Sequence, residues 1–201
     1  IDAASNNGVD EIRDIRDKVK YAPSSVQYKV YIVDEVHMLS IGAFNALLKT
    51  LEEPPKHVIF ILATTEPHKI PLTIISRCQR FDFRRITASA IVGRMKEIIH
   101  NQHVDVEETA LDVIARAADG GMRDALSLLD QAISYSDERV RVEEALLITG
   151  AVSQGFLGKI AEAIQEKDAT GALQALDQVM YQGKDPARFI EDLIYYYRDM
   201  L

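Results

Sequence analysis

The sequence lacks features that would assign it to several common classes of protein. It contains no tryptophan and one cysteine, Cys78, so it cannot form an internal disulfide, which fits a reducing compartment. No apolar run approaches the roughly 20 residues of a membrane-spanning helix, and the longest lies near Val58–Ala63. The first residues are polar and do not resemble a signal peptide. We therefore expect a cytoplasmic globular protein with no membrane association.

The phosphate loop of P-loop nucleotidases, G-x-x-x-x-G-K-[ST], is also missing from these residues, although another element of that class is present. Four apolar residues, Val30–Val33, lead directly into Asp34 and Glu35. A run that is apolar on both faces predicts a strand buried in a parallel sheet, and ligands of such sheets bind at the carboxyl ends of strands. In P-loop nucleotidases one acidic residue there holds Mg²⁺ and a second polarises the attacking water. The pair could instead cap the next helix, but its place after an apolar strand favours nucleotide chemistry.

Charge is distributed unevenly along the chain, whose formal net charge is −8. All of the excess negative charge lies after Thr87, which argues against a surface that wraps DNA broadly. A basic cluster before that point could contact an anion or could form a solvated edge; it consists of Arg77, Arg80, Arg84 and Arg85. His100 and His103 lack the acidic or cysteine partners of a metal site.

The pattern of apolar residues divides the chain into an α/β part followed by an all-α part. Up to Thr87 it predicts parallel strands alternating with helices, as in a parallel layer whose beginning is absent. The expected elements are a helix carrying Val9, Ile12, Ile15 and Val19, a strand over Val30–Val33, a helix capped by Ser40, a buried strand over Val58–Ala63, a short helix over Leu72–Ser76 opened by Pro71, and a strand over Arg80–Phe83.

After Thr87 the pattern predicts only helices. Four of them are expected over residues 88–101, from 107, over 122–134 and from 142, and a second helical set begins at Ser153. In that set Asp168 and Asp185 are predicted N-caps. The last helix keeps an apolar stripe to the chain end, so we expect its packing partners downstream or on another subunit; the stripe consists of Phe189, Ile190, Leu193, Ile194, Tyr197 and Leu201.

Three further positions can bear on phosphate chemistry. Thr64 and Thr65 end the second strand, where their hydroxyls could sense a γ-phosphate, although β-propensity alone also places threonine there. Arg77 could be an arginine finger acting on a neighbouring subunit, or simply a surface arginine. Arg123, in the first turn of a helix, opposes the helix dipole, which suggests a phosphate contact unless Asp119 and Asp124 pair with it.

Together these segments resemble the gamma/tau family of bacterial clamp-loader ATPases, which belong to the AAA+ class, most closely those of Gram-positive bacteria. The resemblance covers essentially the whole chain. It rests on five motifs in the family's order, namely a Walker B element at Asp34–Ser40, its following helix at Phe44–Pro55, a sensor-1 strand at Leu62–Thr65, an SRC motif at Ile75–Cys78 and a sensor-2 element at Gly120–Ser127.

The resemblance implies three parts: the C-terminal portion of a RecA-like ATPase domain (residues 1–86), a helical lid (87–150) and the start of an oligomerisation collar (151–201). The family's phosphate loop and four-cysteine zinc module would precede these residues, and a tail that binds polymerase III core and the replicative helicase would follow them. We therefore expect ATP, Mg²⁺ and zinc to bind the full-length protein but not the present chain. The implied partners are the other subunits of a hetero-pentamer, the sliding clamp and primed DNA.

The resemblance also implies a role for each candidate residue. Asp34 would hold Mg²⁺, Glu35 would polarise the attacking water, and Thr65, with Thr64, would read the γ-phosphate. Arg123 would contact phosphate in cis, and Arg77 would complete a neighbour's site. The alternative is a non-hydrolysing structural subunit that keeps the finger but has no phosphate loop of its own.

Overall fold

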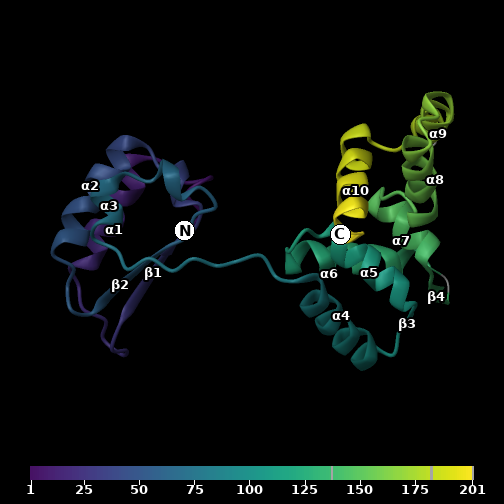
Figure 1. Cartoon of the computed structure of the whole chain (residues 1–201). Helices are drawn as coiled ribbons and strands as arrows, with labels where there is room; N and C mark the ends of the chain where they lie inside the picture. The colour runs from purple at the N-terminus through teal and green to yellow at the C-terminus, as the bar shows by residue number, and fades with distance from the viewer. Residues whose placement is uncertain (137, 182, 201) are drawn as a thin grey trace. The chain divides into compact units, whose positions relative to one another are not determined.

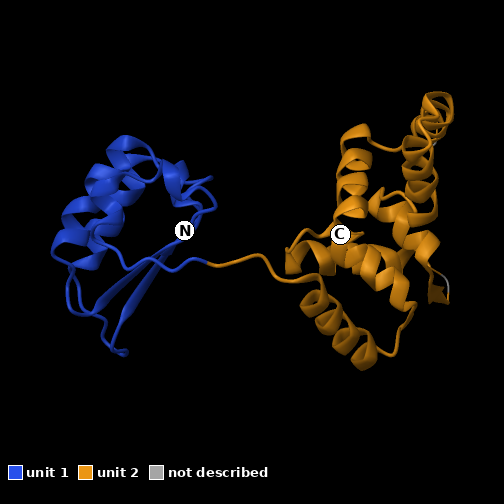
Figure 2. Cartoon of the chain, viewed as in Figure 1, with its two compact units in different colours: residues 1–82 blue, residues 83–201 orange. Residues whose placement is uncertain are grey.

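The computed structural model describes residues 1–136, 138–181 and 183–200, so Leu201 of the predicted apolar stripe lies outside the described residues. The chain forms two compact units, Ile1–Asp82 and Phe83–Leu201 (Figure 2). The first unit is α/β and the second is almost entirely helical (Figure 1). The predicted fold class, an α/β part followed by an all-α part, is confirmed.

The first unit is built around a short parallel sheet. Its elements are α1 (Val9–Val19), β1 (Lys29–Val33), the 3-10 helix η1 (Val36–Met38), α2 (Ile41–Glu52), β2 (Val58–Leu62), the 3-10 helix η2 (Pro67–Lys69) and α3 (Leu72–Ile75). β1 and β2 pair in parallel, with Lys29 opposite Val58 and Val33 opposite Leu62. On the other edge of β1, Asp2 forms a parallel bridge with Asp34.

Within the described part of the first unit, helices cover one face of this sheet. Helices α1 and α2 lie on that face (Figure 1). The core between them and the sheet contains Ile12, Val19, Val33, Phe44 and Leu47, and the rings of Tyr31 and Phe60 stack on the same side with centroids 5.4 Å apart. The side chains of alternate strand residues point the other way, and they are exposed by 44–53%; they are Val30, Ile32, Ile59 and Ile61.

The prediction that both strands are buried on both faces is therefore wrong for the described residues. Successive side chains of a strand point to opposite faces, and no described element of the first unit packs on the second face of the sheet. A second correction concerns the strand expected over Arg80–Phe83, because residues 79–87 have no regular structure and Phe83 is 97% exposed. Alternating apolar residues make a strand only where a neighbouring backbone can pair with them.

The second unit consists of helices and one very short sheet. Its elements are α4 (Ala88–Gln102), β3 (Asp105–Val106), α5 (Glu108–Ala117), α6 (Met122–Tyr135), β4 (Arg139–Val140), α7 (Val142–Thr149), α8 (Gln154–Gln165), α9 (Ala169–Tyr181) and α10 (Pro186–Asp199). The parallel pair β3–β4 corrects the expectation of helices alone. Two residues per strand are too few for a period-2 pattern to be recognised.

Two separate cores hold this unit together. One lies among α4–α7 and includes Ile91, Met95, Ile114 and Leu129, and the other lies among α8–α10 around Ile160. The compact units divide the chain after Asp82, four residues before the expected end of the ATPase part, and the division into three domains stays a prediction. Among the described residues, no helix is long and apolar enough to cross a bilayer.

Candidate functional site

The two acidic residues lie at the carboxyl end of β1, as predicted. The backbone N–H of Asp34 donates to the carbonyl of Ile1, and the carbonyl of Asp34 accepts from the N–H of Ala3, both at 2.9 Å. These two bonds to residues 1–3 fix the backbone position of Asp34. Asp34 Oδ1 accepts a hydrogen bond from the N–H of Glu35 at 3.0 Å. Glu35 has φ = +47°, a left-handed conformation that is uncommon for a residue with a side chain. The chain thus turns sharply as it leaves the strand.

The end of β2 meets this turn. Thr65 donates to Glu35 Oε2 from both its N–H (3.4 Å) and its hydroxyl (3.1 Å). Thr64 Oγ1 accepts from the N–H of Glu66 at 3.0 Å. The structure therefore brings Glu35, Thr64 and Thr65 to one edge of the sheet, because the carboxyl ends of neighbouring parallel strands coincide.

Three residues that the sequence analysis did not single out complete this edge. His37 Nδ1 lies 3.0 Å from Thr64 Oγ1 and 3.2 Å from Glu35 Oε2, and its Nε2 lies 3.1 Å from Glu66 Oε2. Lys69 donates to the same oxygen of Glu66 at 2.7 Å, which lowers the pKa of that carboxyl below its ordinary value. A histidine two residues after an acidic pair was the available signal, but periodicity gives it no function.

Asp34 fits a magnesium ligand of the kind that nucleotide-binding sites use. Its side chain is exposed and, within the described part of the chain, only its Oδ1 takes a hydrogen bond, so Oδ2 is open. Mg²⁺ is usually held by one or two carboxylates together with substrate phosphates and water. No group of three or more metal-binding side chains occurs among the described residues.

Arg77 lies away from this edge, just after α3. Its Nη2 is 2.9 Å from Glu52 Oε1, at the end of α2, and its Nη1 donates to the carbonyl of Thr73 at 2.8 Å and to Ser76 Oγ at 3.1 Å. Two other arginines of the basic cluster also have acidic partners: Arg80 pairs with Asp82, and Arg85 pairs with Asp119. The cluster therefore does not converge on one anion site.

Arg123 belongs to the second unit, in the first turn of α6. Neither acidic neighbour proposed as its partner pairs with it in the described part of the chain, because Asp119 instead accepts from Arg85 and, at 3.3 Å, from the hydroxyl of Tyr195. The Arg85 guanidinium holds the pKa of Asp119 below its ordinary value. Arg123 is exposed, so its charge is available to a ligand.

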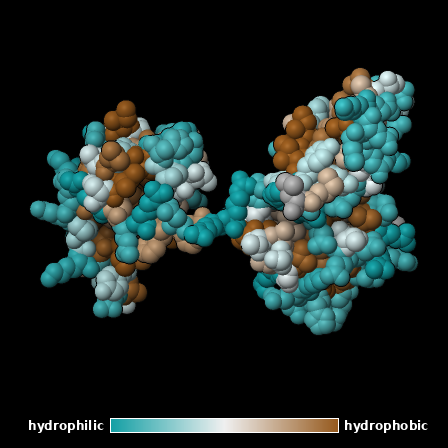
Figure 3. All heavy atoms as spheres, in the orientation of Figure 1, coloured by the Kyte–Doolittle hydropathy of each residue, from teal (hydrophilic) through white to brown (hydrophobic). Residues whose placement is uncertain are grey.

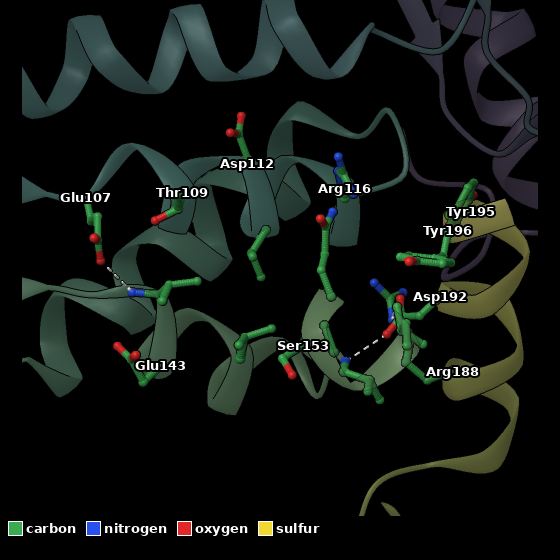
Figure 4. A pocket seen from close by; sticks show the side chains of 17 residues that line it. Glu107, Thr109, Asp112, Arg116, Glu143, Ser153, Arg188, Asp192, Tyr195 and Tyr196 are labelled. Carbon is green, nitrogen blue, oxygen red and sulfur yellow. Dashed lines mark hydrogen bonds and ion pairs between the residues drawn. The ribbon is translucent and has the colours of Figure 1, made fainter. Parts of the chain in front are cut away.

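One cleft of the second unit contains none of the predicted site residues. It has a volume of about 740 Å³ and lies between α5, α7, α8 and α10 (Figure 4). Two backbone N–H groups close its ends, that of Val142 on Glu107 Oε2 at 3.1 Å and that of Val152 on Asp192 Oδ2 at 2.9 Å. These hydrogen bonds join the start of α7 to the start of α5, and α10 to the segment before α8. The cleft is therefore a space between helices that are connected by hydrogen bonds.

Comparison with known proteins shows which family the chain is similar to. Residues 2–87 match the family described as DNA polymerase III, delta subunit, and residues 90–138 match the DNA polymerase III clamp loader subunit, ATPase lid domain. The chain is 73% identical over 201 residues to DNA polymerase III subunit tau of Bacillus subtilis, across all of this chain and 36% of that protein. The chain belongs to the DNA polymerase III gamma/tau family.

Other gamma/tau proteins also match most of this chain. It is 43% identical over 183 residues to subunit tau of Escherichia coli, covering 91% of this chain and 28% of that one. It thus spans about a third of the length of these relatives. A structure of RuvB from Thermotoga maritima aligns with a TM-score of 0.59 at 15% identity, over 84% of this chain and 59% of RuvB, which shows a shared AAA+ fold.

Proposed function

We propose that the full-length protein is an ATPase subunit of the bacterial replicative clamp loader within the DNA polymerase III holoenzyme. ATP binding assembles the subunits and opens the sliding clamp, and hydrolysis releases the clamp around primed DNA. The observation that carries the proposal is the contact between Glu35 and Thr65 at the carboxyl ends of adjacent parallel strands. It places a carboxylate and a hydroxyl side by side where α/β sheets bind ligands.

Each candidate residue has a role that its position supports. The open Oδ2 of Asp34 holds Mg²⁺, directly or through water, and Mg-ATP supplies the phosphoryl group when it is bound. Glu35 accepts the hydrogen bond of the attacking water, while Thr65 orients Glu35 and, with Thr64, reads the γ-phosphate. Arg123 contacts phosphate in cis from the lid, and Arg77 reaches the site of a neighbouring subunit.

The helical end of the chain supports assembly with other subunits. Along α10 the side chain of Phe189 is buried, whereas Ile190 is 55% and Ile194 60% exposed. Figure 3 shows hydrophobic surface over this helix. An exposed apolar stripe of this kind is typical of a protein–protein interface, which supports a collar that joins the subunits of a hetero-pentamer. The contacts with polymerase core and helicase, the zinc module and a cytoplasmic location stay predictions from the family resemblance.

A second candidate function is a non-hydrolysing structural subunit of the same assembly. It is favoured by the match of residues 2–87 to the delta subunit family. The two proposals differ in one respect, because an ATPase needs a phosphate loop and a structural subunit does not. The genomic sequence that flanks these 201 residues distinguishes them: an upstream G-x-x-x-x-G-K-[ST] excludes the structural subunit.

Hydrolysis by the assembled full-length protein tests the ATPase proposal. Glu35→Gln removes the carboxylate charge but keeps the size of the side chain, so ATP should still bind while hydrolysis falls by ~10² or more. Asp14→Asn, on an exposed position of α1, is a matched control and should behave as the unsubstituted protein. Wild-type rates in Glu35→Gln would show that another group polarises the water.

The present 201 residues, taken alone, should bind nucleotide weakly. Backbone amides and the lysine of a phosphate loop supply most of the grip on phosphates, whereas Asp34 and Glu35 present negative charge to a negatively charged ligand. Isothermal titration with Mg-ATP should therefore detect no tight binding and no hydrolysis. A dissociation constant near 1 μM, about −8 kcal/mol, would mean that the grip lies in residues of this chain other than those named.

A further inference from the structure

His37 joins two carboxylates that the sequence separates by thirty residues. It follows the turn at Glu35 and lies in η1, where its side chain is only 8% exposed. Its two ring nitrogens face in different directions. Nδ1 faces Glu35 Oε2 (3.2 Å) and Thr64 Oγ1 (3.0 Å), and Nε2 faces Glu66 Oε2 (3.1 Å).

We propose that His37 is a positioning residue that holds the Glu35 carboxylate in the orientation needed to polarise water. The inference rests on the proposed ATPase function. The two oxygens of Glu35 have different surroundings, because Oε2 is next to His37 Nδ1 and takes both hydrogen bonds from Thr65. In the described part of the chain no group donates to Oε1, which is therefore the oxygen available to a water molecule. One oxygen is fixed so that the other has a defined direction.

Fixing Glu35 from the side-chain end matters because hydrogen bonds of its backbone do not set its side-chain torsions. Glu35 lies in a left-handed turn between β1 and η1, where its N–H donates to Asp34 Oδ1 and its carbonyl accepts from the N–H of Met38 at 2.8 Å. A carboxylate on two methylene groups has several rotamers in such a place. Misplacing a reacting group by about 1 Å can reduce a rate by ~10². The contact with His37 reduces that freedom.

Glu66 anchors the opposite side of the imidazole ring. Its Oε2 accepts from Lys69 and lies beside His37 Nε2, and its backbone N–H donates to Thr64 Oγ1. The ring is thus held between the segment that follows β1 and the segment that follows β2. A rotation of His37 would break contacts with both segments, so its orientation is set by the sheet edge itself.

Two isosteric substitutions separate the two sides of the ring. Asparagine places an amide nitrogen near the Nδ1 position of histidine. His37→Asn therefore keeps a donor toward Glu35 and loses the contact with Glu66. Glutamine places its amide near the Nε2 position. His37→Gln therefore keeps the contact with Glu66 and loses the contact with Glu35. If His37 merely tied the two segments together, both variants would lose about equally or the glutamine variant would perform better.

The test compares His37→Ala, His37→Asn and His37→Gln in the assembled full-length protein, with ATP hydrolysis and ATP binding measured separately. We expect His37→Ala to lower kcat by ~10–100-fold with KM for ATP within ~3-fold, as for a group that acts only on the chemical step. His37→Asn should recover kcat to within ~5-fold of wild type, and His37→Gln should resemble His37→Ala. ATP affinity should be unchanged in all three.

Control measurements separate failure of this inference from failure of the ATPase proposal. If the unsubstituted assembly does not hydrolyse ATP, the ATPase proposal falls, and this inference falls with it. If the unsubstituted protein hydrolyses ATP and Glu35→Gln does not, but His37→Ala keeps wild-type kcat, only the positioning role is wrong. Recovery by His37→Gln but not by His37→Asn would also overturn it, because the contact with Glu66 would then be the one that matters.

Discussion

Replacing Arg77 by alanine should abolish most ATP hydrolysis in the assembled protein while leaving each subunit folded and able to bind ATP. The proposed role of Arg77 is to supply positive charge to the transition state in a neighbouring subunit's site. Arginine fingers of this kind accelerate phosphoryl transfer by ~10³–10⁵. We therefore expect a fall of ~10³ or more, which corresponds to about 4 kcal/mol of lost transition-state stabilisation.

The structure shows why loss of stability cannot produce a fall of that size. Within its own subunit the Arg77 side chain is 36% exposed, and its ionic partner, Glu52, is 48% exposed. Ion pairs exposed to this extent contribute about 0–1 kcal/mol, because solvent screens them. The exposed hydrogen bond from Arg77 to the carbonyl of Thr73 adds about 0.5–1.5 kcal/mol. The melting temperature should therefore fall by only a few degrees.

Mixed assemblies make the assay specific for action between subunits. Arg77→Ala and Glu35→Gln subunits, each inactive alone, should recover part of the activity when mixed, because some junctions then combine an intact finger with an intact base. Glu52→Gln is the matched control, since it breaks the same ion pair and keeps the arginine, and its rate should stay within ~10-fold of wild type. Normal hydrolysis by pure Arg77→Ala assemblies would refute the reasoning.

Three further outcomes follow from the contacts described. In the unsubstituted protein Arg85 lowers the pKa of Asp119, so in Arg85→Ala this pKa should rise toward its ordinary value in an NMR titration. The ion pair stabilises the fold above pH ~4, and this stabilisation is lost as the pH falls through the lowered pKa. In Arg85→Ala this pH-dependent stabilisation should be absent. An unchanged pKa would mean that Arg85 is not its cause. Thr65→Val keeps the N–H bond but loses the hydroxyl bond to the catalytic carboxylate, so kcat should fall ~10-fold, and an unchanged kcat would contradict this contact's role. Aspartate at both Ile190 and Ile194 should dissociate assemblies in sedimentation without lowering Tm, since both side chains are more than half exposed; intact assemblies would place the interface elsewhere.

The sequence was sufficient to predict which residues meet at the carboxyl edge of the sheet. Parallel strands end at the same edge, so once Val30–Val33 and the run from Val58 are assigned as neighbouring strands, Glu35 and Thr65 must lie close together. The hydrogen bond between them is a direct consequence. The same argument could not find His37, because it depends on which way a side chain points after an irregular turn with φ = +47° at Glu35.

Burial was harder to predict than pairing. An apolar run of four or five residues gives the same pattern whether helices cover one face of the sheet or both, because β-branched residues also favour strands for local reasons. Here the side chains of Val30 and Ile59 lie opposite each other across the strands and are both exposed, as are those of Ile32 and Ile61. Whether helices cover one face of the sheet or both depends on the packing of the whole domain. The sequence of a single strand does not contain this information.

The surroundings of Arg123 show how a long-range contact decides between two local interpretations. The sequence offered Asp119 and Asp124 as partners that would make this arginine an ordinary surface residue. The structure assigns Asp119 to Arg85, thirty-four residues earlier, and Asp124 bends its carboxylate back toward Gly121 at the start of α6. A cation in the first turn of a helix then opposes the helix dipole at a cost of about 0.3–1 kcal/mol, and no ion pair within the described residues offsets it. An anion near the N-terminus of α6 would remove this cost, because the free N–H groups of the first turn and the guanidinium would both attract it. That gain, available only when an anion is present, is the physical basis for proposing that Arg123 responds to bound phosphate.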